Sequence, residues 1–235
     1  MEKTPFILYK LATRSRPTRF EDTLQSIIQN SSTEDYLVLV SIDVDDLSMN
    51  KYLDDIDLGL GFPHNNVVVV SGESKNKIDA INRDIEKVKD RWRIDWDILV
   101  NISDDMLITS PKFDYVVRSF FAETTDLFLH LPDGFQNENV ATMSIMGYDY
   151  YKRFDYIYHP SYESVWCDCE AMDVAKILGR YIYHNEKLFV HNHPAFIGRS
   201  IWDAQYERTE SKEVHDKDCI NYNNRKKNQF DAIQD

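Results

Sequence analysis

Short apolar runs alternate with helical patterns through the first hundred residues, and this alternation limits the possible folds more than any other feature. Segments 19–29 and 75–92 place their apolar residues at helical spacing. The apolar runs that we interpret as buried strands are 6–11, 36–42, 67–70 and 97–101. Strands that alternate with helices predict a mostly parallel sheet with helices on its faces. Between the second and third strands, residues 43–66 are irregular and polar.

The second half of the chain has shorter patterned segments. They are strand candidates at 126–130, 140–146, 181–183 and 188–190, and a helix at 168–178. A turn-like PDG sequence at 132–134 separates the first two strands, and Gly179 is placed to cap the helix. The chain is polar from Trp202 onward. Because it contains no internal repeat and no clear linker, we predict one α/β domain with a polar C-terminal extension over 201–235.

The charge balance narrows the classes of ligand. The chain carries 27 Lys and Arg against 40 Asp and Glu, a formal net charge of −13. A surface this acidic repels phosphate backbones and anionic lipids, so we expect no nucleic-acid partner and no membrane-surface role. Clustered carboxylates instead favour a hard divalent cation.

Glycine and cysteine usage excludes several further classes. None of the seven glycines completes a dinucleotide fingerprint or a phosphate-binding P-loop. Cys167, Cys169 and Cys219 form no disulfide framework, which favours a reducing compartment. No apolar run is long enough to span a membrane, and the first ten residues lack a signal-peptide core. We therefore expect a cytoplasmic protein.

Acidic residues follow two of the predicted strands. Asp104 and Asp105 come just after the strand at 97–101, and Asp43 follows the strand at 36–42. In open α/β sheets, ligands bind beyond the carboxyl ends of the strands, so these side chains project into the expected crevice. The alternative for the pair is an ordinary turn or helix cap. For Asp45 and Asp46, a solvated acidic loop is the stronger interpretation.

Two later motifs add candidate ligands and bases. His191 and His193 lie two apart, so in an extended segment both imidazoles face one side and could bind one ion. Taken alone, this motif is more often a polar strand end. Asp168 and Glu170 open the predicted helix, where the helix dipole favours acids and where one carboxylate could act as a general base. A thiolate metal site using the flanking cysteines is disfavoured.

Basic residues near the crevice could hold a diphosphate. Arg14 and Arg16 follow the first strand, and Lys77 opens the helical segment after the third. Most basic residues of such a chain are solvated, but an acidic protein that binds a diphosphate must keep a few cations at the site.

The order of these parts resembles the GT-A type of nucleotide-sugar-dependent glycosyltransferases, particularly the family-2-like enzymes. The resemblance spans residues 5–200, and its motifs occur in the order ATRSRP, SIDVDD, KNKIDAIN, DILVNISDDM, LPDG, WCDCE and HNHP. The SDD sequence is similar to the family's metal-binding D-x-D motif, with Ser103 in place of its first acid. HNHP is similar to the late histidine that completes the metal site. The resemblance implies a nucleotide-binding half over 1–110 and an acceptor half over 111–200.

Carried over residue by residue, the resemblance implies four sets of site residues. The nucleotide set is Thr13, Arg14, Asp43, Lys77, Asn82 and Asp104. The metal set is Asp105 with one of His191 and His193, holding Mn²⁺ or Mg²⁺. Asp168 or Glu170 would be the base that deprotonates the acceptor, with inversion of the anomeric centre. Within the acceptor half, the candidate acceptor contacts are Asp133, Thr142 and Trp166, of which Trp166 could stack on a sugar ring or belong to the core.

The function that follows is transfer of a sugar from a nucleoside-diphosphate sugar to a hydroxyl acceptor. One alternative is a nucleotidyltransferase that makes a nucleotide sugar, although its usual glycine-rich basic loop is replaced here by TRSRPTRF. Another is an inactive sugar-binding module of the same fold.

Overall fold

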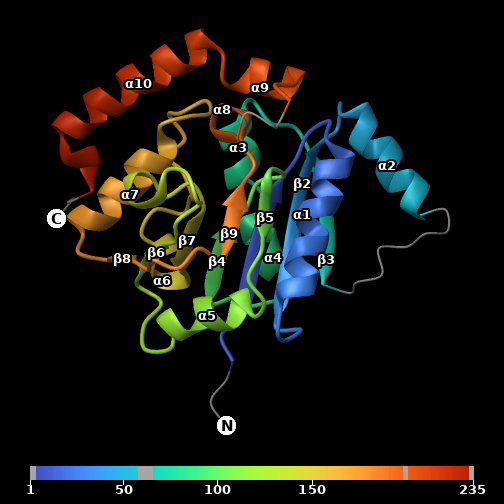
Figure 1. Ribbon diagram of the computed structural model, residues 1–235, viewed down its shortest axis with the longest axis horizontal. Helices are drawn as coiled ribbons and strands as arrows, with labels where there is room; N and C mark the ends of the chain where they lie inside the picture. Colours follow the sequence, from blue (N-terminus) through green and yellow to red (C-terminus); the bar gives the residue numbers. More distant parts are fainter. Residues whose placement is uncertain (1–3, 58–65, 198–200, 233–235) are drawn as a thin grey trace.

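The computed structural model describes residues 4–57, 66–197 and 201–232, and within them a seven-stranded sheet forms the centre of the molecule (Figure 1). The sheet order is β3-β2-β1-β4-β7-β6-β8. The strands are β1 Ile7–Ala12, β2 Tyr36–Asp43, β3 Val67–Gly72, β4 Ile98–Asn101, β6 Phe128–His130, β7 Ser144–Gly147 and β8 Tyr181–Tyr183. Only β7 runs against its neighbours, so the predicted α/β class with a mostly parallel sheet is confirmed.

Helices cover both faces of the sheet, and a separate hydrophobic core lies on each face. The helices on each face pack their apolar residues into the core on that side. On one face lie α1 Pro17–Asn30, α2 Leu47–Asp57 and α5 Phe113–Phe120. On the other lie α3 Lys77–Asn82, α4 Ile85–Trp92, α6 Tyr148–Tyr151, α7 Cys167–Ile177 and α10 Lys212–Lys227. Successive residues of the central strands enter opposite cores, as Leu8 and Tyr9 of β1 do. No helix among the described residues is long and apolar enough to cross a membrane.

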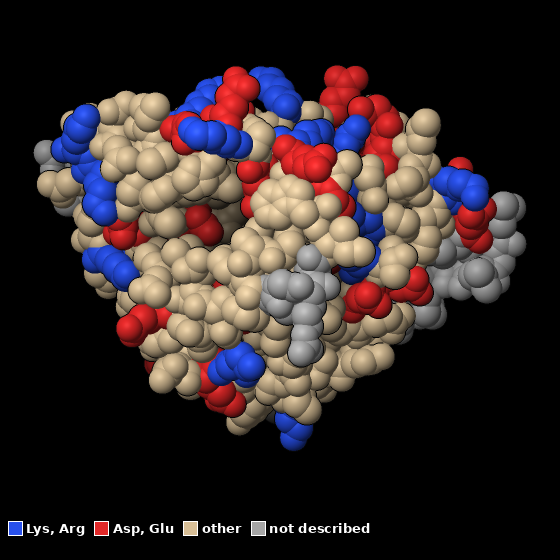
Figure 2. All heavy atoms as spheres, turned by 45° about the horizontal axis from the view of Figure 1, so that its top comes forward, with Lys and Arg blue, Asp and Glu red and all other residues tan. Residues whose placement is uncertain are grey.

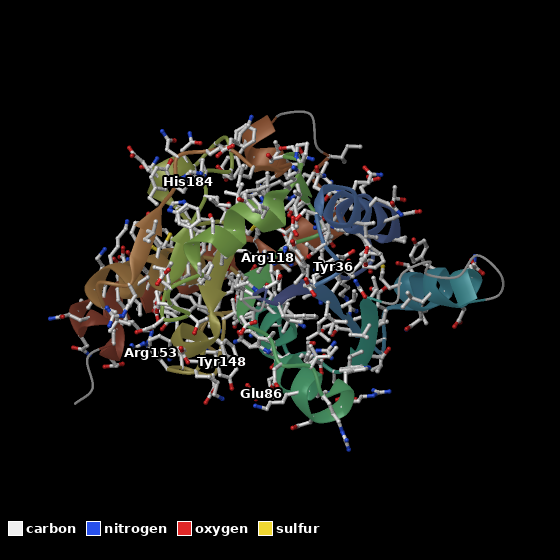
Figure 3. All side chains as sticks on the ribbon, turned by 90° about the horizontal axis from the view of Figure 1, so that it is seen from below. Tyr36, Glu86, Arg118, Tyr148, Arg153 and His184 are labelled. Atoms are coloured by element: carbon white, nitrogen blue, oxygen red, sulfur yellow. The ribbon has the colours of Figure 1, made fainter. Side chains whose placement is uncertain are left out.

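A second, two-stranded sheet sets the geometry of the site. Strands β5 Met106–Ile108 and β9 Phe189–His191 pair antiparallel, with Met106 opposite His191. The short helices α8 Pro194–Ile197 and α9 Ala204–Thr209 follow β9 along the chain. At the opposite end of the main sheet, seen in Figure 3, the guanidinium of Arg118 donates to the backbone carbonyls of Pro5 and Asp35, near Tyr36.

Two segments differ from the sequence-based expectation. The polar stretch after β2 contains α2, which follows Asp46 because its carboxylate accepts a hydrogen bond from Met49 N–H. The expected helix at 75–92 is broken into α3 and α4 at Asp84, whose φ is 76°. The buried Asp84 carboxylate accepts from Ser41 and pairs with Lys87, so the chain turns inward there while the apolar period continues on both sides.

Candidate active site

Two adjoining cavities lie beyond the carboxyl ends of β1, β2 and β4, where the sequence placed its acids. The smaller has a volume of about 70 Å³ and the larger about 310 Å³. Lys77, Asp105 and Glu210 line both. Figure 2 shows this face hollowed, with acidic side chains inside and around the hollow. The two cavities therefore form one crevice divided by shared side chains.

Five of the predicted nucleotide residues line the smaller cavity: Thr13, Arg14, Asp43, Lys77 and Asp104. Both oxygens of the buried Asp104 carboxylate have partners. Thr13 donates to one at 2.7 Å, and Arg16 lies 3.0 Å from the other. Burial raises the pKa of Asp104, and Arg16 opposes that rise.

The Asp43 carboxylate is only half satisfied. Arg14 donates to its Oδ2 at 2.8 Å, whereas Oδ1 is buried and has no hydrogen-bond partner among the described residues. Arg14 also grips Asp45 with two hydrogen bonds of 2.6 and 2.8 Å. Lys77, in contrast, makes no hydrogen bond or ion pair with the described part of the chain, although its charge acts on Asp105 and Asp168. Among the described residues, the cavity therefore offers one buried acceptor without a hydrogen bond, Asp43 Oδ1, which lies 3.8 Å from the Arg83 guanidinium. It also offers two cations without a hydrogen bond or ion pair, Lys77 and Arg208.

The pairing of β5 with β9 brings Asp105 to His191. The backbone N–H of Asn192 donates to the carbonyl of Asp105 at 2.7 Å, and the His191 Nε2 atom lies 3.4 Å from Asp105 Oδ2. Burial raises the pKa of Asp105, but His191 and the Ser103 hydroxyl outweigh it and hold the pKa well below its ordinary value. Burial lowers the pKa of His191, and Asp105 and Asp133 together overcome this and raise it to about 9.

The second imidazole of the motif has a different partner. His193 Nε2 lies 2.9 Å from an oxygen of Glu210, and its ring centre is 5.5 Å from that of His191. Asp105 and His191 supply one oxygen and one nitrogen, a mixed donor set that suits Mn²⁺. Within residues 4–57, 66–197 and 201–232, no three His, Cys, Asp or Glu side chains are gathered closely enough to hold an ion alone. The remaining donors would have to come from a ligand, as is usual for cations that bind with phosphates.

The larger cavity is lined by Asp168, Thr142, Trp166, His191 and His193. Asp168 makes one local hydrogen bond, from Cys169 N–H at 2.9 Å. Burial raises the pKa of Asp168, while that bond and Lys77 lower it in part. A half-buried carboxylate with one hydrogen-bond donor can still accept a proton from a ligand in this cavity.

Three predicted residues lie outside both cavities. Glu170 is buried in a bidentate ion pair with Arg225, with separations of 2.8 and 2.9 Å, and accepts from Tyr162. The side-chain amide of Asn82 forms hydrogen bonds with the backbone of residues 157 and 158. Asp133 is buried behind His191, where it organises the turn after β6.

The C-terminal segment 203–210 contributes site residues that the sequence had not indicated. Tyr206 donates its hydroxyl to Asp105 Oδ2 at 2.7 Å, and its ring lies 3.9 Å from the Arg16 guanidinium. Arg16 also pairs with Asp203, which caps α9. The available signal was Asp203 itself, a helix-capping residue type, but no apolar period follows it.

The comparisons with known proteins agree with this architecture. No protein-family model and no curated protein matches the sequence. Among solved structures, the mannosyltransferase PcManGT from Pyrobaculum calidifontis, in complex with GDP-Man and Mn²⁺, has a TM-score of 0.62 at 11% identity, and the match covers 91% of this chain and 70% of that one. S. aureus TarS 1-349 in complex with UDP has a TM-score of 0.59 at 12% identity, covering 94% and 71%. A second TarS 1-349 structure covers 80% and 61%, with a TM-score of 0.58 at 12% identity. The fold is that of the GT-A glycosyltransferases.

Proposed function

From the GT-A fold as premise, we propose that the protein is a divalent-cation-dependent glycosyltransferase that moves a sugar from a nucleoside-diphosphate sugar to a hydroxyl acceptor, with inversion. One observation carries the proposal. The donor pair Asp105 and His191 and the half-buried carboxylate Asp168 face adjoining cavities at the carboxyl edge of the sheet. A cation-dependent glycosyltransferase that inverts its substrate needs a cation and a base on two sides of one reacting carbon.

The smaller cavity holds the nucleotide in this proposal. Asp43 Oδ1, which has no hydrogen bond within the described residues and lies 3.8 Å from Arg83, accepts a hydrogen bond from a nucleobase N–H. This bond satisfies a buried acceptor that otherwise costs stability. Lys77, free of protein partners among the described residues, pairs with the diphosphate. Asp104 contacts the ribose after exchanging one of its bonds with Thr13 or Arg16.

Asp105 and His191 are the residues that would hold a divalent cation, with His193 beside them. When bound, such a cation neutralises the charge that develops on the leaving diphosphate. Of the solved structures with a similar fold, PcManGT is in complex with GDP-Man and Mn²⁺ and TarS 1-349 is in complex with UDP, so a nucleoside-diphosphate sugar with Mn²⁺ is the first donor class to test.

Asp168 is the better candidate for the base. It lines the larger cavity, where an acceptor hydroxyl can reach it, whereas Glu170 is committed to Arg225 and lies outside the cavity. The raised pKa of Asp168 makes its carboxylate a stronger base than an exposed one. Thr142 and Trp166 stand in the same cavity to position the acceptor. Attack from this side, opposite the diphosphate, inverts the anomeric centre.

The proposal is tested by turnover of UDP-, GDP- and CMP-sugars with Mn²⁺, comparing wild type with Asp105→Ala. Asp216→Ala is the matched control, because this acid lies on the exposed helix α10. We expect nucleoside diphosphate to be released by wild type and by the control, and at least a 100-fold lower rate for Asp105→Ala. Release of pyrophosphate from a nucleoside triphosphate would identify a nucleotidyltransferase and contradict the proposal.

A further inference from the structure

We propose that Asp133 is a positioning residue that holds the Nδ1 proton of His191, so that Nε2, the nitrogen on the side of Asp105, is the one that gives its lone pair to a cation. This inference rests on the proposed function, since it assigns Asp133 a role behind the cation site. It differs from the role in acceptor binding that the sequence predicts for Asp133.

The two carboxylate oxygens of Asp133 have different hydrogen-bond partners. Oδ1 accepts three backbone N–H bonds, from Phe135 and Gln136 at 2.7 Å each and from Asn137 at 3.2 Å. These bonds build the turn after β6 and fix the orientation of the carboxylate. Oδ2 accepts only from Thr142, at 3.2 Å, and is therefore free to accept a second bond.

The Oδ2 atom of Asp133 lies next to His191. The separation between Asp133 Oδ2 and His191 Nδ1 is 3.8 Å, and on the other side of the ring Nε2 lies 3.4 Å from Asp105. Nδ1 is buried and has no hydrogen-bond partner in the described part of the chain. A movement of less than about 1 Å brings the pair into hydrogen-bond range. His193 and Phe196 also pack on the imidazole, but through their rings.

The tautomer of His191 decides whether it can bind a cation. A histidine ligand gives one nitrogen lone pair to the metal and keeps its proton on the other nitrogen, usually donated to a carboxylate or carbonyl. Here the nitrogen that faces Asp105 must be the unprotonated one. When a cation displaces the proton from Nε2, the ring keeps one proton, and the anion at Oδ2 of Asp133 favours that proton on Nδ1.

Asp133→Asn reverses this preference while preserving the turn. The three backbone donors require an oxygen at the Oδ1 position, so the new amide must place its NH₂ group where Oδ2 was. An amide N–H that faces Nδ1 makes Nδ1 the acceptor and moves the imidazole proton to Nε2. The variant should therefore fold but bind the cation poorly, because Nε2 no longer offers a lone pair.

The experiment is a double-mutant cycle of Mn²⁺ affinity over wild type, Asp133→Asn, His191→Ala and the double variant. Free Mn²⁺ is followed by electron paramagnetic resonance, with the ion alone and with UDP or GDP added. Thermal unfolding without Mn²⁺ verifies that each variant is folded. We expect Asp133→Asn to weaken Mn²⁺ binding about 10- to 100-fold in the presence of His191 and to have no effect in its absence.

Each outcome decides one claim. Equal Mn²⁺ affinity in wild type and Asp133→Asn overturns the positioning role and leaves the proposed function standing. An equal loss with and without His191 shows that Asp133 acts only through the turn, which also overturns it. Failure of the wild type to bind Mn²⁺ under any of these conditions contradicts the cation requirement of the proposed function, and the positioning role falls with it.

Discussion

Tyr206→Phe should strengthen the binding of a divalent cation rather than weaken it. The Tyr206 hydroxyl donates to Asp105 Oδ2 at 2.7 Å, and His191 Nε2 lies 3.4 Å from the same oxygen, so an ion that binds there competes with the tyrosine hydroxyl. A hydrogen bond to a charged group contributes about 1.5–3 kcal/mol. Because 1.4 kcal/mol corresponds to a factor of ten, the phenylalanine variant should bind Mn²⁺ about 10- to 100-fold more tightly.

The same segment also restricts the space for a nucleotide. Tyr206 and Glu210 line the smaller cavity, whose volume of about 70 Å³ is far below the roughly 300 Å³ at which ligand pockets begin. We therefore predict that segment 203–210 shifts when a nucleoside diphosphate binds, and that this shift breaks the bond from Tyr206 to Asp105.

The assay is isothermal titration of Mn²⁺, with Tyr222→Phe as the matched control. This variant also loses a hydroxyl that donates to a carboxylate, Asp173, at 2.7 Å. The lost bond joins the helices α7 and α10, and neither residue lines either cavity. The control should bind Mn²⁺ as wild type does. Unchanged or weaker Mn²⁺ binding by Tyr206→Phe would refute the competition between hydroxyl and cation.

Three further predictions concern single carboxylates and a buried lysine. Asp168→Asn should lower the initial rate about 100-fold or more, while donor binding measured by calorimetry stays unchanged. In wild type, the rate should fall on the acid side at a pH above the ordinary carboxyl pKa of about 3.9, because burial raises the pKa of Asp168 and its ionised form is the base. Glu170→Gln should cost about 1.5–3 kcal/mol in urea unfolding, since it removes the charge from the bidentate pair with the partly buried Arg225, which keeps only the Phe230 carbonyl and Asp231 as further partners among the described residues. The rate of the folded enzyme should stay near that of wild type. Burial lowers the pKa of Lys10 to about 7, below its value in the unfolded chain. Between pH 7 and pH 10 the unfolded chain therefore binds one proton more than the folded protein, so the free energy of unfolding of wild type should rise with pH. Urea unfolding of Lys10→Met should lack this rise.

The positions of the site residues that directly follow strands in the sequence could be predicted, because the carboxyl ends of parallel strands lie at one edge of the sheet. Asp43, Asp104 and Asp105 lie at that edge as expected. The contact between Asp105 and His191 was foreseeable only through the family resemblance, which implies that Asp105 and one of His191 and His193 hold the same ion. Their pairing through β5 and β9 was not, because β5 is only three residues long and carries no distinctive alternation.

The misjudged parts are those where tertiary contacts override local pattern. The helical period of 75–92 continues correctly, but the inward turn of Asp84 toward Ser41 breaks the helix. The helix α10 is polar along most of its length, so periodicity gave no sign of it, although it is joined to α7 by Glu170 and Arg225. The contact of Tyr206 with Asp105 spans 101 residues, and no local pattern carries that information.

The central claim is that this crevice binds a nucleoside-diphosphate sugar through a divalent cation. Calorimetric titration of wild-type protein with UDP-, GDP- and CMP-sugars, each in Mn²⁺ and in EDTA, measures it directly. We predict one-to-one binding of at least one of these sugars in Mn²⁺, with that binding lost in EDTA. Binding of equal strength in Mn²⁺ and EDTA, or binding of none of the three classes in Mn²⁺, would contradict the account.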